Sequence, residues 1–234
     1  MSKAPKTNDL DLRLAVTAAL LGAGIPRDAI RHEITLDSSS SDGRADMVVA
    51  TDRALIGIEI KSGKDTLDRL ESQRERYGAR FDKLVLVLDA RHEPADYAAG
   101  HRFGFDAVRV YDAGVIREAR FVMAYQSAPW EPTTYYDGRL PGAGERMAPH
   151  AMLSMLWADE ALFVAADLVK AGLIPPAGGH QRFRIIPHAA EHASIGLLRP
   201  RIAAALRARR PNKWEAAFWA KYDALHAAPM EAAA

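Results

Sequence analysis

The sequence predicts an α/β protein: a mixed β-sheet flanked by helices, followed by a helical C-terminal part. Three observations predict it. Residues 44–61 hold two runs of strand-forming residues on either side of a short polar turn. Residues 84–88 are apolar at every position, which is typical of a central strand buried on both faces. Helical patterns then follow, at residues 149–171, 188–209 and 213–226.

The composition limits the classes of protein to consider. With 49% hydrophobic and 26% charged residues, the 234-residue chain is typical of a soluble globular protein. It has no cysteine, which excludes a disulfide framework, a thiolate metal site and a cysteine nucleophile. We find no signal peptide and no apolar run that could span a membrane, so we expect a cytoplasmic protein without a membrane partner. Because the net charge is only +1, nucleic-acid binding would need a local basic patch.

The first predicted element is a helix. Residues 1–8 are expected to form a disordered tail, and Asn8 or Asp9 can cap a helix that runs to about Leu21. Its apolar stripe is predicted to pack over the sheet and comprises Leu10, Leu14, Thr17, Leu20 and Leu21.

Three strands are predicted next. Residues 30–36 alternate enough to form a strand that carries Glu33, and the polar residues 37–43 form a turn into the strand that carries Asp46. A tight turn at residues 51–53 then leads into the third strand. The result is an antiparallel meander of three strands.

Asp46, Glu59 and Lys61 are predicted to converge on this meander. Alternation places Glu59 and Lys61 on one face of the third strand and Ile56, Ile58 and Ile60 on the other. The hairpin lays Asp46 beside them. Two carboxylates are the hard ligands that Mg²⁺ or Mn²⁺ prefers, and a nearby lysine can polarise an attacking water. The alternative is a solvated strand face with an ordinary ion pair.

A helix is predicted after Lys61, capped by Ser62 or Asp65 and ending near Gly78. Gln73 and Tyr77 lie one above the other on it, because they are four residues apart. Its inner side is formed by Leu67, Leu70 and Tyr77.

The remaining core is a strand at residues 83–88 and a hairpin of residues 106–111 and 115–123. Proline and glycine are frequent between residues 127 and 149, which indicates a loop or linker. We therefore divide the chain into a core (1–126), a linker or loop (127–149) and a helical C-terminal region (150–234).

These residues resemble the signature of the PD-(D/E)XK nuclease superfamily. Asp46 matches its first acidic position and Glu59-Ile60-Lys61 matches (D/E)-X-K, with Ala45 in place of the proline. The segment from Gln73 to Tyr77 resembles the QxxxY motif of the RecB-type branch. The order helix, three strands, helix, strand (αβββαβ) is that of the restriction-endonuclease-like core. The resemblance is good over residues 30–125 and loose over the remainder, and it includes a bacterial and phage family of this superfamily.

The resemblance implies a metal-dependent nuclease that hydrolyses phosphodiester bonds, in DNA rather than RNA, in repair, recombination or phage-related processing. The cofactor would be Mg²⁺ or Mn²⁺, held by Asp46, Glu59 and the backbone carbonyl of Ile60, with Glu33 as a further ligand. Lys61 would activate water. The resemblance is also compatible with a homodimer or with a protein partner. The alternative is a non-catalytic nuclease-fold module that binds nucleic acid or a protein.

The helix between the third and fourth strands would supply the substrate contacts. The resemblance implies that Gln73 and Tyr77 support the site and contact the nucleic-acid backbone. Arg69 and Arg74 on the same helix would either grip phosphates or lie in solvent.

Three further features have simpler interpretations. Residues 199–213 are the most basic stretch, and we interpret them as an amphipathic helix with a solvated side rather than a nucleic-acid clamp. Residues 188–192 match the zinc-protease pattern HxxEH, but the pattern is short, and only Glu215 or Glu231 could add a third ligand. The tryptophans are expected in the core: Trp130, Trp157, Trp214 and Trp219.

Overall fold

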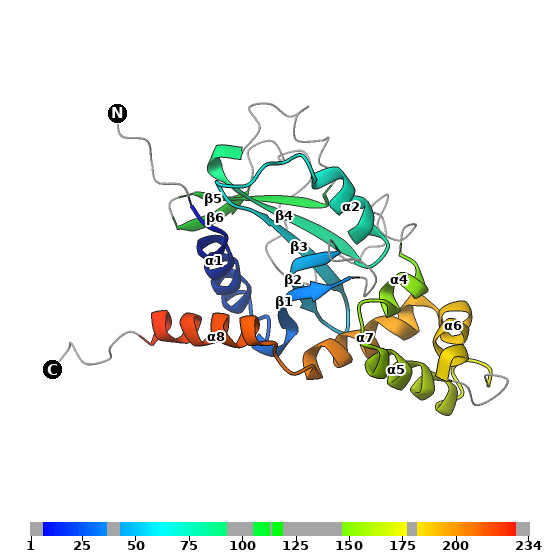
Figure 1. The fold of residues 1–234 in the computed structure, drawn as a ribbon. Coiled ribbons are helices and arrows are strands. Elements are labelled where there is room, and N and C mark those ends of the chain that lie inside the picture. The colour runs from blue at the N-terminus through cyan, green and yellow to red at the C-terminus, as the bar shows by residue number, and fades with distance from the viewer. Residues whose placement is uncertain are drawn as a thin grey trace, which may run out of the picture.

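The computed structural model describes residues 7–36, 43–92, 105–112, 114–118, 147–176 and 182–227. Within these ranges the chain is an α/β protein with one six-stranded mixed, open sheet and seven α-helices (Figure 1). The strands are β1 (Ile30–Thr35), β2 (Arg44–Ala50), β3 (Leu55–Lys61), β4 (Lys83–Asp89), β5 (Ala107–Asp112) and β6 (Val115–Glu118). The helices are α1 (Asp9–Gly22), α2 (Leu70–Gly78), α4 (Pro149–Leu153), α5 (Ala158–Lys170), α6 (Arg182–His192), α7 (Ile195–Ala208) and α8 (Lys213–His226). Two short 3₁₀ turns are η1 (Arg27–Ala29) and η2 (Ala90–His92).

The strands lie side by side in the order of the sequence. β1, β2 and β3 form an antiparallel meander, β4 runs parallel to β3, β5 runs parallel to β4, and β6 returns antiparallel. Every residue of β4 is buried, as expected for a central strand with helices over both faces. The predicted mixed sheet and the order helix, three strands, helix, strand are confirmed.

Helices cover both faces of the sheet. On one face, α1 and α8 pack over a cluster that includes Ile58 and Ile60. On the other, α2 and the group α4–α7 cover a cluster that includes Leu55 and Ala50 (Figure 1). The prediction that Ile58 and Ile60 lie on the opposite face of β3 from Leu55 is therefore confirmed.

The end points of α1 are as predicted, and its inner face is so only in part. The Asn8 side chain accepts a hydrogen bond from the Asp11 N–H, and the helix ends at Gly22. Its buried residues are Leu12, Arg13, Val16, Thr17 and Leu20. The predicted stripe is therefore confirmed in part: Thr17 and Leu20 are buried, whereas Leu10, Leu14 and Leu21 are only partly buried at the margin of the same cluster. Arg13, which bonds to Glu33 of β1 and Asp46 of β2, also lies on this buried face.

The predicted start of α2 was also wrong. Its first residue is Leu70, well after Ser62 and Asp65. The Asp65 carboxylate accepts hydrogen bonds from the Ser62 N–H (2.8 Å) and hydroxyl (2.6 Å), so these groups close a local turn instead of capping a helix. The end at Gly78 and the buried positions of Leu70 and Tyr77 are as predicted.

Two of the predicted C-terminal helices are each a pair of shorter helices. The predicted helix 149–171 divides at Ser154, whose hydroxyl lies 2.7 Å from the Ala151 carbonyl and 2.8 Å from the Leu36 carbonyl. The predicted helix 188–209 corresponds to α6 and α7, and Ser194 caps α7 by accepting from the Leu197 N–H. The third predicted helix, at residues 213–226, has the bounds of α8.

The tryptophans are only partly in the core. Trp219 is buried, whereas Trp157 is 56% and Trp214 is 41% exposed, so the prediction was wrong for these two. Both exposed rings lie at the first turn of a helix. The Arg209 guanidinium lies over the Trp157 ring, and Trp214 stacks on Phe218.

Several predictions fall outside the described residues. These are the structure of the tail (1–6) and of the turn at 37–42, residues 119–123 of the last predicted strand, Trp130 and most of the linker. The division into three regions stays a prediction, although α4–α7 share a buried cluster with the sheet. No helix in the part that the structure describes is long and apolar enough to cross a membrane.

Candidate active site

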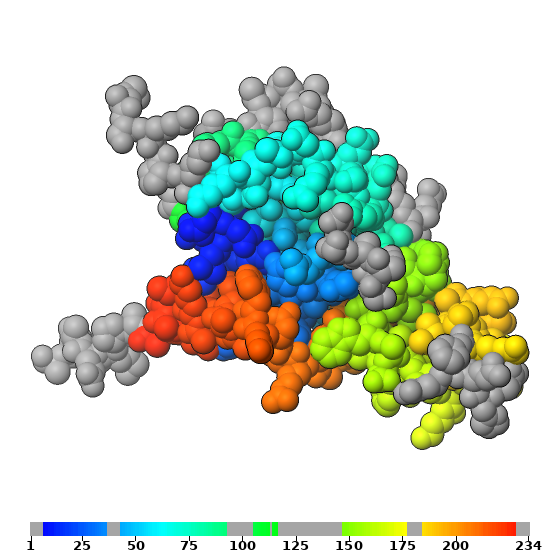
Figure 2. All heavy atoms as spheres, in the orientation of Figure 1, coloured from blue at the N-terminus to red at the C-terminus, as the bar shows by residue number. Residues whose placement is uncertain are grey.

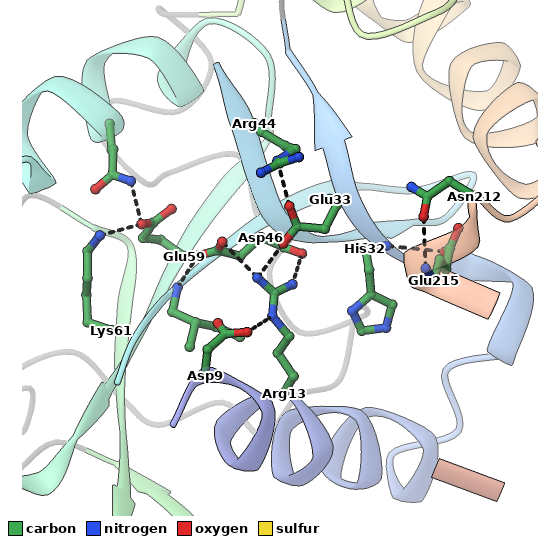
Figure 3. Close-up of polar contacts among 12 residues, drawn as sticks. Asp9, Arg13, His32, Glu33, Arg44, Asp46, Glu59, Lys61, Asn212 and Glu215 are labelled. Carbon is green, nitrogen blue, oxygen red and sulfur yellow. Dashed lines mark hydrogen bonds and ion pairs between the residues drawn. The ribbon is translucent and has the colours of Figure 1, made fainter. Parts of the chain in front are cut away.

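Asp46, Glu59 and Lys61 lie together on neighbouring strands. The β2–β3 register pairs Met47 with Ile58, which places Asp46 beside Glu59 (Figure 3). Glu59 and Lys61 are buried, whereas the Asp46 side chain is 24% exposed. The predicted convergence of two carboxylates and an ammonium is therefore present, with Asp46 as the most open of the three.

The Glu59 carboxylate is held by three donors. Lys61 Nζ lies 2.7 Å and Gln73 Nε2 lies 2.5 Å from Oε1, while the Tyr77 hydroxyl lies 2.7 Å from Oε2. Burial, with Glu59 and Asp46 nearby, raises the pKa of Tyr77 far above its ordinary value, so the hydroxyl keeps the proton that it donates. The structure thus brings Gln73 and Tyr77 to the site by way of Glu59.

Asp46 has one donor at each carboxylate oxygen. Oδ2 accepts from the Ile60 N–H at 2.8 Å, and Oδ1 accepts from Arg13 Nη2 at 2.9 Å. Burial and the negative charge of Glu59 nevertheless hold the pKa of Asp46 well above its usual range, against the opposing effect of Arg13 and the Ile60 N–H. Asp46 and Glu59 therefore lie close enough for their carboxylates to repel each other when both are ionised.

These features fit a divalent cation. Asp46 and Glu59 supply the hard oxygen atoms that Mg²⁺ and Mn²⁺ prefer, and a cation would relieve the repulsion between them. The Gln73 Oε1 atom, buried beside Glu59, has no hydrogen-bond partner. Among the described residues, no three histidine, aspartate or glutamate side chains gather as a metal set. Backbone oxygen and water would complete the shell.

Arg13 is part of the site and was missed by the sequence analysis. Its buried guanidinium contacts Asp9 (2.6 Å), Glu33 (2.6 Å), the Asp46 carboxylate and the Asp46 carbonyl. Burial opposes the charge, but Asp46, Asp9 and Glu33 outweigh it and raise the pKa of Arg13. A signal for it was present, because Asp9 and Arg13 are four residues apart on a predicted helix, the spacing of an ion pair.

Glu33 lies on β1 opposite Asp46, in an unusual conformation. Its φ of 55° is the only positive φ of a non-glycine residue in the described part of the chain. The alternation of β1 is reversed there, because Ile30 packs in the cluster under α1 and Ile34 in the opposite cluster. The Glu33 carboxylate pairs with Arg13 at Oε1 and with Arg44 at Oε2, each at 2.6 Å. Its predicted role as a metal ligand stays a prediction.

Residues 4–95 match the family model of bacteriophage P4 protein cII. This range covers α1 to β4 and contains the whole site. No curated protein and no solved structure matches the chain.

The surface next to the site is partly basic. Arg44 is 60% exposed, and Figure 2 shows the blue β1–β2 hairpin reaching the surface between α2 and α8. Arg69 is exposed just before α2, and Arg74 is half-buried on it. Neither side chain has an ion pair within the described ranges.

The most basic stretch has a structural role. Four arginines of residues 199–213 pair with carboxylates of other elements: Arg199 with Asp82, Arg201 with Asp167, Arg207 with Asp28 and Arg209 with Glu160. These pairs fasten α7 to its neighbours, which supports the interpretation that this stretch is not a nucleic-acid clamp. Glu215, considered above as a zinc ligand for the HxxEH pattern, is instead buried in an ion pair with Arg31.

Proposed function

We propose that the chain is a nuclease of the PD-(D/E)XK superfamily, with a restriction-endonuclease-like core, that hydrolyses phosphodiester bonds in DNA. The observation that carries the proposal is the joint arrangement of Asp46, Glu59 and Lys61 on β2 and β3, with Gln73 and Tyr77 bound to Glu59. Five motif residues from three elements meet at one carboxylate pair. The succession α1, β1–β3, α2, β4 supports it further.

Asp46 and Glu59 would hold a Mg²⁺ or Mn²⁺ ion, which when bound supplies positive charge to the scissile phosphate and to the leaving oxygen. Gln73 and Tyr77 fix the orientation of Glu59 through the hydrogen bonds described above. Lys61, whose ammonium lies against Glu59, orients the attacking water and neutralises charge that develops on the phosphate. Arg69 and Arg74 would bind flanking phosphates.

The match to a family model named for a bacteriophage protein supports the phage-related part of the proposal. Repair and recombination are the related processes that the superfamily resemblance implies. Both concern DNA, which is why DNA is favoured over RNA as the substrate.

The proposal is tested by cleavage assays on linear, nicked, branched and single-stranded DNA and on RNA, with Mg²⁺, Mn²⁺ or EDTA. We expect metal-dependent cutting that falls roughly a hundredfold or more in Asp46→Asn and Lys61→Met, because both lose charge without losing volume. Lys221→Met, an exposed lysine of α8, is the matched control and should cut like the parent chain. Undiminished cutting by Lys61→Met would refute the proposal.

One observation favours a second candidate, a nuclease-fold module that binds nucleic acid or a protein without cutting. All four oxygen atoms of the Asp46 and Glu59 carboxylates already have a donor within the protein. Such a satisfied network is stable without a metal ion. DNA binding that persists in EDTA, together with no cleavage in any metal, would favour this candidate.

A further inference from the structure

The guanidinium of Arg13 lies between two carboxylates of the site. A single nitrogen atom, Nη2, lies 2.6 Å from Glu33 Oε1 and 2.9 Å from Asp46 Oδ1, and Figure 3 shows the group placed between the two side chains. Asp46 in turn is the neighbour of Glu59. The carboxylates of Glu33, Asp46 and Glu59 therefore lie in a row with Asp46 in the middle. The guanidinium of Arg13 is the cation between Glu33 and Asp46.

Arg13 is held in this position from several directions. Its Nε atom donates to Asp9, Nη1 donates to the Asp46 carbonyl, and its Cζ atom lies 4.9 Å from the centre of the Trp214 ring. Only 3% of its side chain is exposed. A guanidinium with these contacts is a fixed charge of the site, unlike the exposed arginines of the surface.

Glu33 is turned toward Arg13 by its backbone. A glutamate at a φ of 55° costs on the order of 1 kcal/mol or more, and such strain persists only where other contacts offset it. Here the offsetting contacts are the ion pairs of Glu33 with Arg13 and Arg44. Both Glu33 oxygen atoms therefore pair with arginines, and neither points toward the space between Asp46 and Glu59.

This arrangement resembles a two-ion site with one position filled by the protein. In two-metal nuclease and phosphatase sites the ions lie about 3.5–4 Å apart on both sides of shared ligands. We propose that Arg13 takes the place of a second divalent ion, so that the site accepts a single ion, held by Asp46 and Glu59, and Glu33 serves Arg13 instead of a metal. The inference rests on the proposed function, since it assumes the first ion.

The number of bound ions tests the inference without any cleavage assay. Mn²⁺ binding is measured by titration calorimetry and by the electron paramagnetic resonance signal of free Mn²⁺. We expect one ion per chain in the parent protein and in Arg13→Lys, which keeps the charge. We expect two ions in Arg13→Met, because Asp46, Glu33 and Asp9 lose their cation. Arg201→Met, which removes an arginine paired with Asp167 on another part of the molecule, should bind one ion.

Glu33→Gln provides a second test that leaves Arg13 in place. Because Glu33 is not a ligand in our proposal, this variant should bind one ion with an affinity within about twofold of the parent protein. In the Arg13→Met background the same substitution should remove the second ion. If Arg13→Met is too unstable to titrate, loss of an ion or of affinity in the single Glu33→Gln variant would still overturn the proposal.

The outcomes separate the two proposals. Two ions in the parent protein, or a Glu33→Gln variant that loses an ion or about tenfold in affinity, would overturn the role of Arg13 and leave the nuclease proposal standing. One ion in both the parent protein and Arg13→Met would do the same. No bound ion in any variant would refute the metal site itself, and with it both proposals.

Discussion

At the scale of single residues, the site combines charged side chains that are close in the sequence with others that only the fold brings together. The sequence identified Asp46, Glu59 and Lys61 because a strand alternates with a period of two, and Gln73 and Tyr77 because a helix brings residues four apart together. It could not identify Arg13 as their partner, since that contact joins α1 to β2 across 33 residues. Nor could it foresee the positive φ of Glu33, which depends on ion pairs with distant arginines.

His32, the neighbour of Glu33, gives a residue-scale prediction about pH. Its ring is fully buried against Phe218, and burial, Arg13 and Arg31 lower its pKa from 6.5 to about 3. Below pH 6.5 the unfolded chain binds a proton at His32 that the folded chain cannot bind until about pH 3. The free energy of unfolding should therefore fall as the pH falls through this window, by up to about 1.4 kcal/mol per unit from this group.

The measurement is urea denaturation of the parent chain and of His32→Leu between pH 7 and 4. We expect the variant to lose less stability over this range than the parent chain. His150→Leu, which removes an exposed histidine of α4, is the control and should keep the full slope. Equal slopes in the parent chain and His32→Leu would show that His32 is not buried in its neutral form.

At the scale of elements, β3 is positioned by a close approach to the turn after α2. A Cβ atom on Gly57 would lie 2.6 Å from the Phe81 ring, which is itself almost fully buried. The third strand therefore carries a glycine between Leu55 and Glu59 so that the aromatic ring can pack directly on its backbone. The same face carries Glu59, so this contact also sets the distance between α2 and the carboxylate that Gln73 and Tyr77 hold.

We predict that Gly57→Ala destabilises the fold by roughly 1–3 kcal/mol, because a buried ring must shift in a packed core. Phe81→Leu should also destabilise the protein, by cavity formation, but the double variant should be more stable than the sum of the two losses predicts. Denaturant unfolding of the four proteins measures the coupling. Strict additivity would mean that the ring and the strand do not meet as described.

The sequence predicted less well the helix ends that depend on which partner a polar side chain bonds to. The bounds of β1, β3, β4 and α8 follow from apolar patterns and caps that no distant residue alters. The start of α2 and the breaks in the C-terminal helices depend instead on whether Ser62, Asp65 and Ser154 bond to a helix end or elsewhere. For Ser154 local sequence cannot decide, because its hydroxyl reaches the carbonyl of Leu36 as well as that of Ala151.

At the scale of the whole molecule, the C-terminal helices complete both faces of the sheet. α8 adds Phe218, Trp219 and Tyr222 to the cluster under α1, and α4–α7 supply much of the cluster on the opposite face. A buried ion pair between Arg31 of β1 and Glu215 of α8, at 2.7 Å, joins the two parts of the chain.

We therefore expect residues 1–126 alone to lack a cooperative unfolding transition, although they contain every site residue. Burying one aromatic side chain stabilises a protein by about 1.5–3 kcal/mol, and three such losses on one face approach the total stability of a typical domain. Circular dichroism during urea titration is the measurement, and co-expression with residues 147–234 should restore the transition. A sharp transition in the fragment alone would establish residues 1–126 as an independent domain.

The Arg31–Glu215 pair also bears on how the protein matures in the cell. The two partners are separated by 184 residues, so Arg31 emerges from the ribosome long before its carboxylate has been translated. At about 5–20 residues per second, the β1–β3 meander then spends on the order of ten seconds or more with a charged group on it that has no native counterion. During that interval we expect the nascent chain to expose the apolar surface that α8 later covers, the kind of surface that chaperones bind.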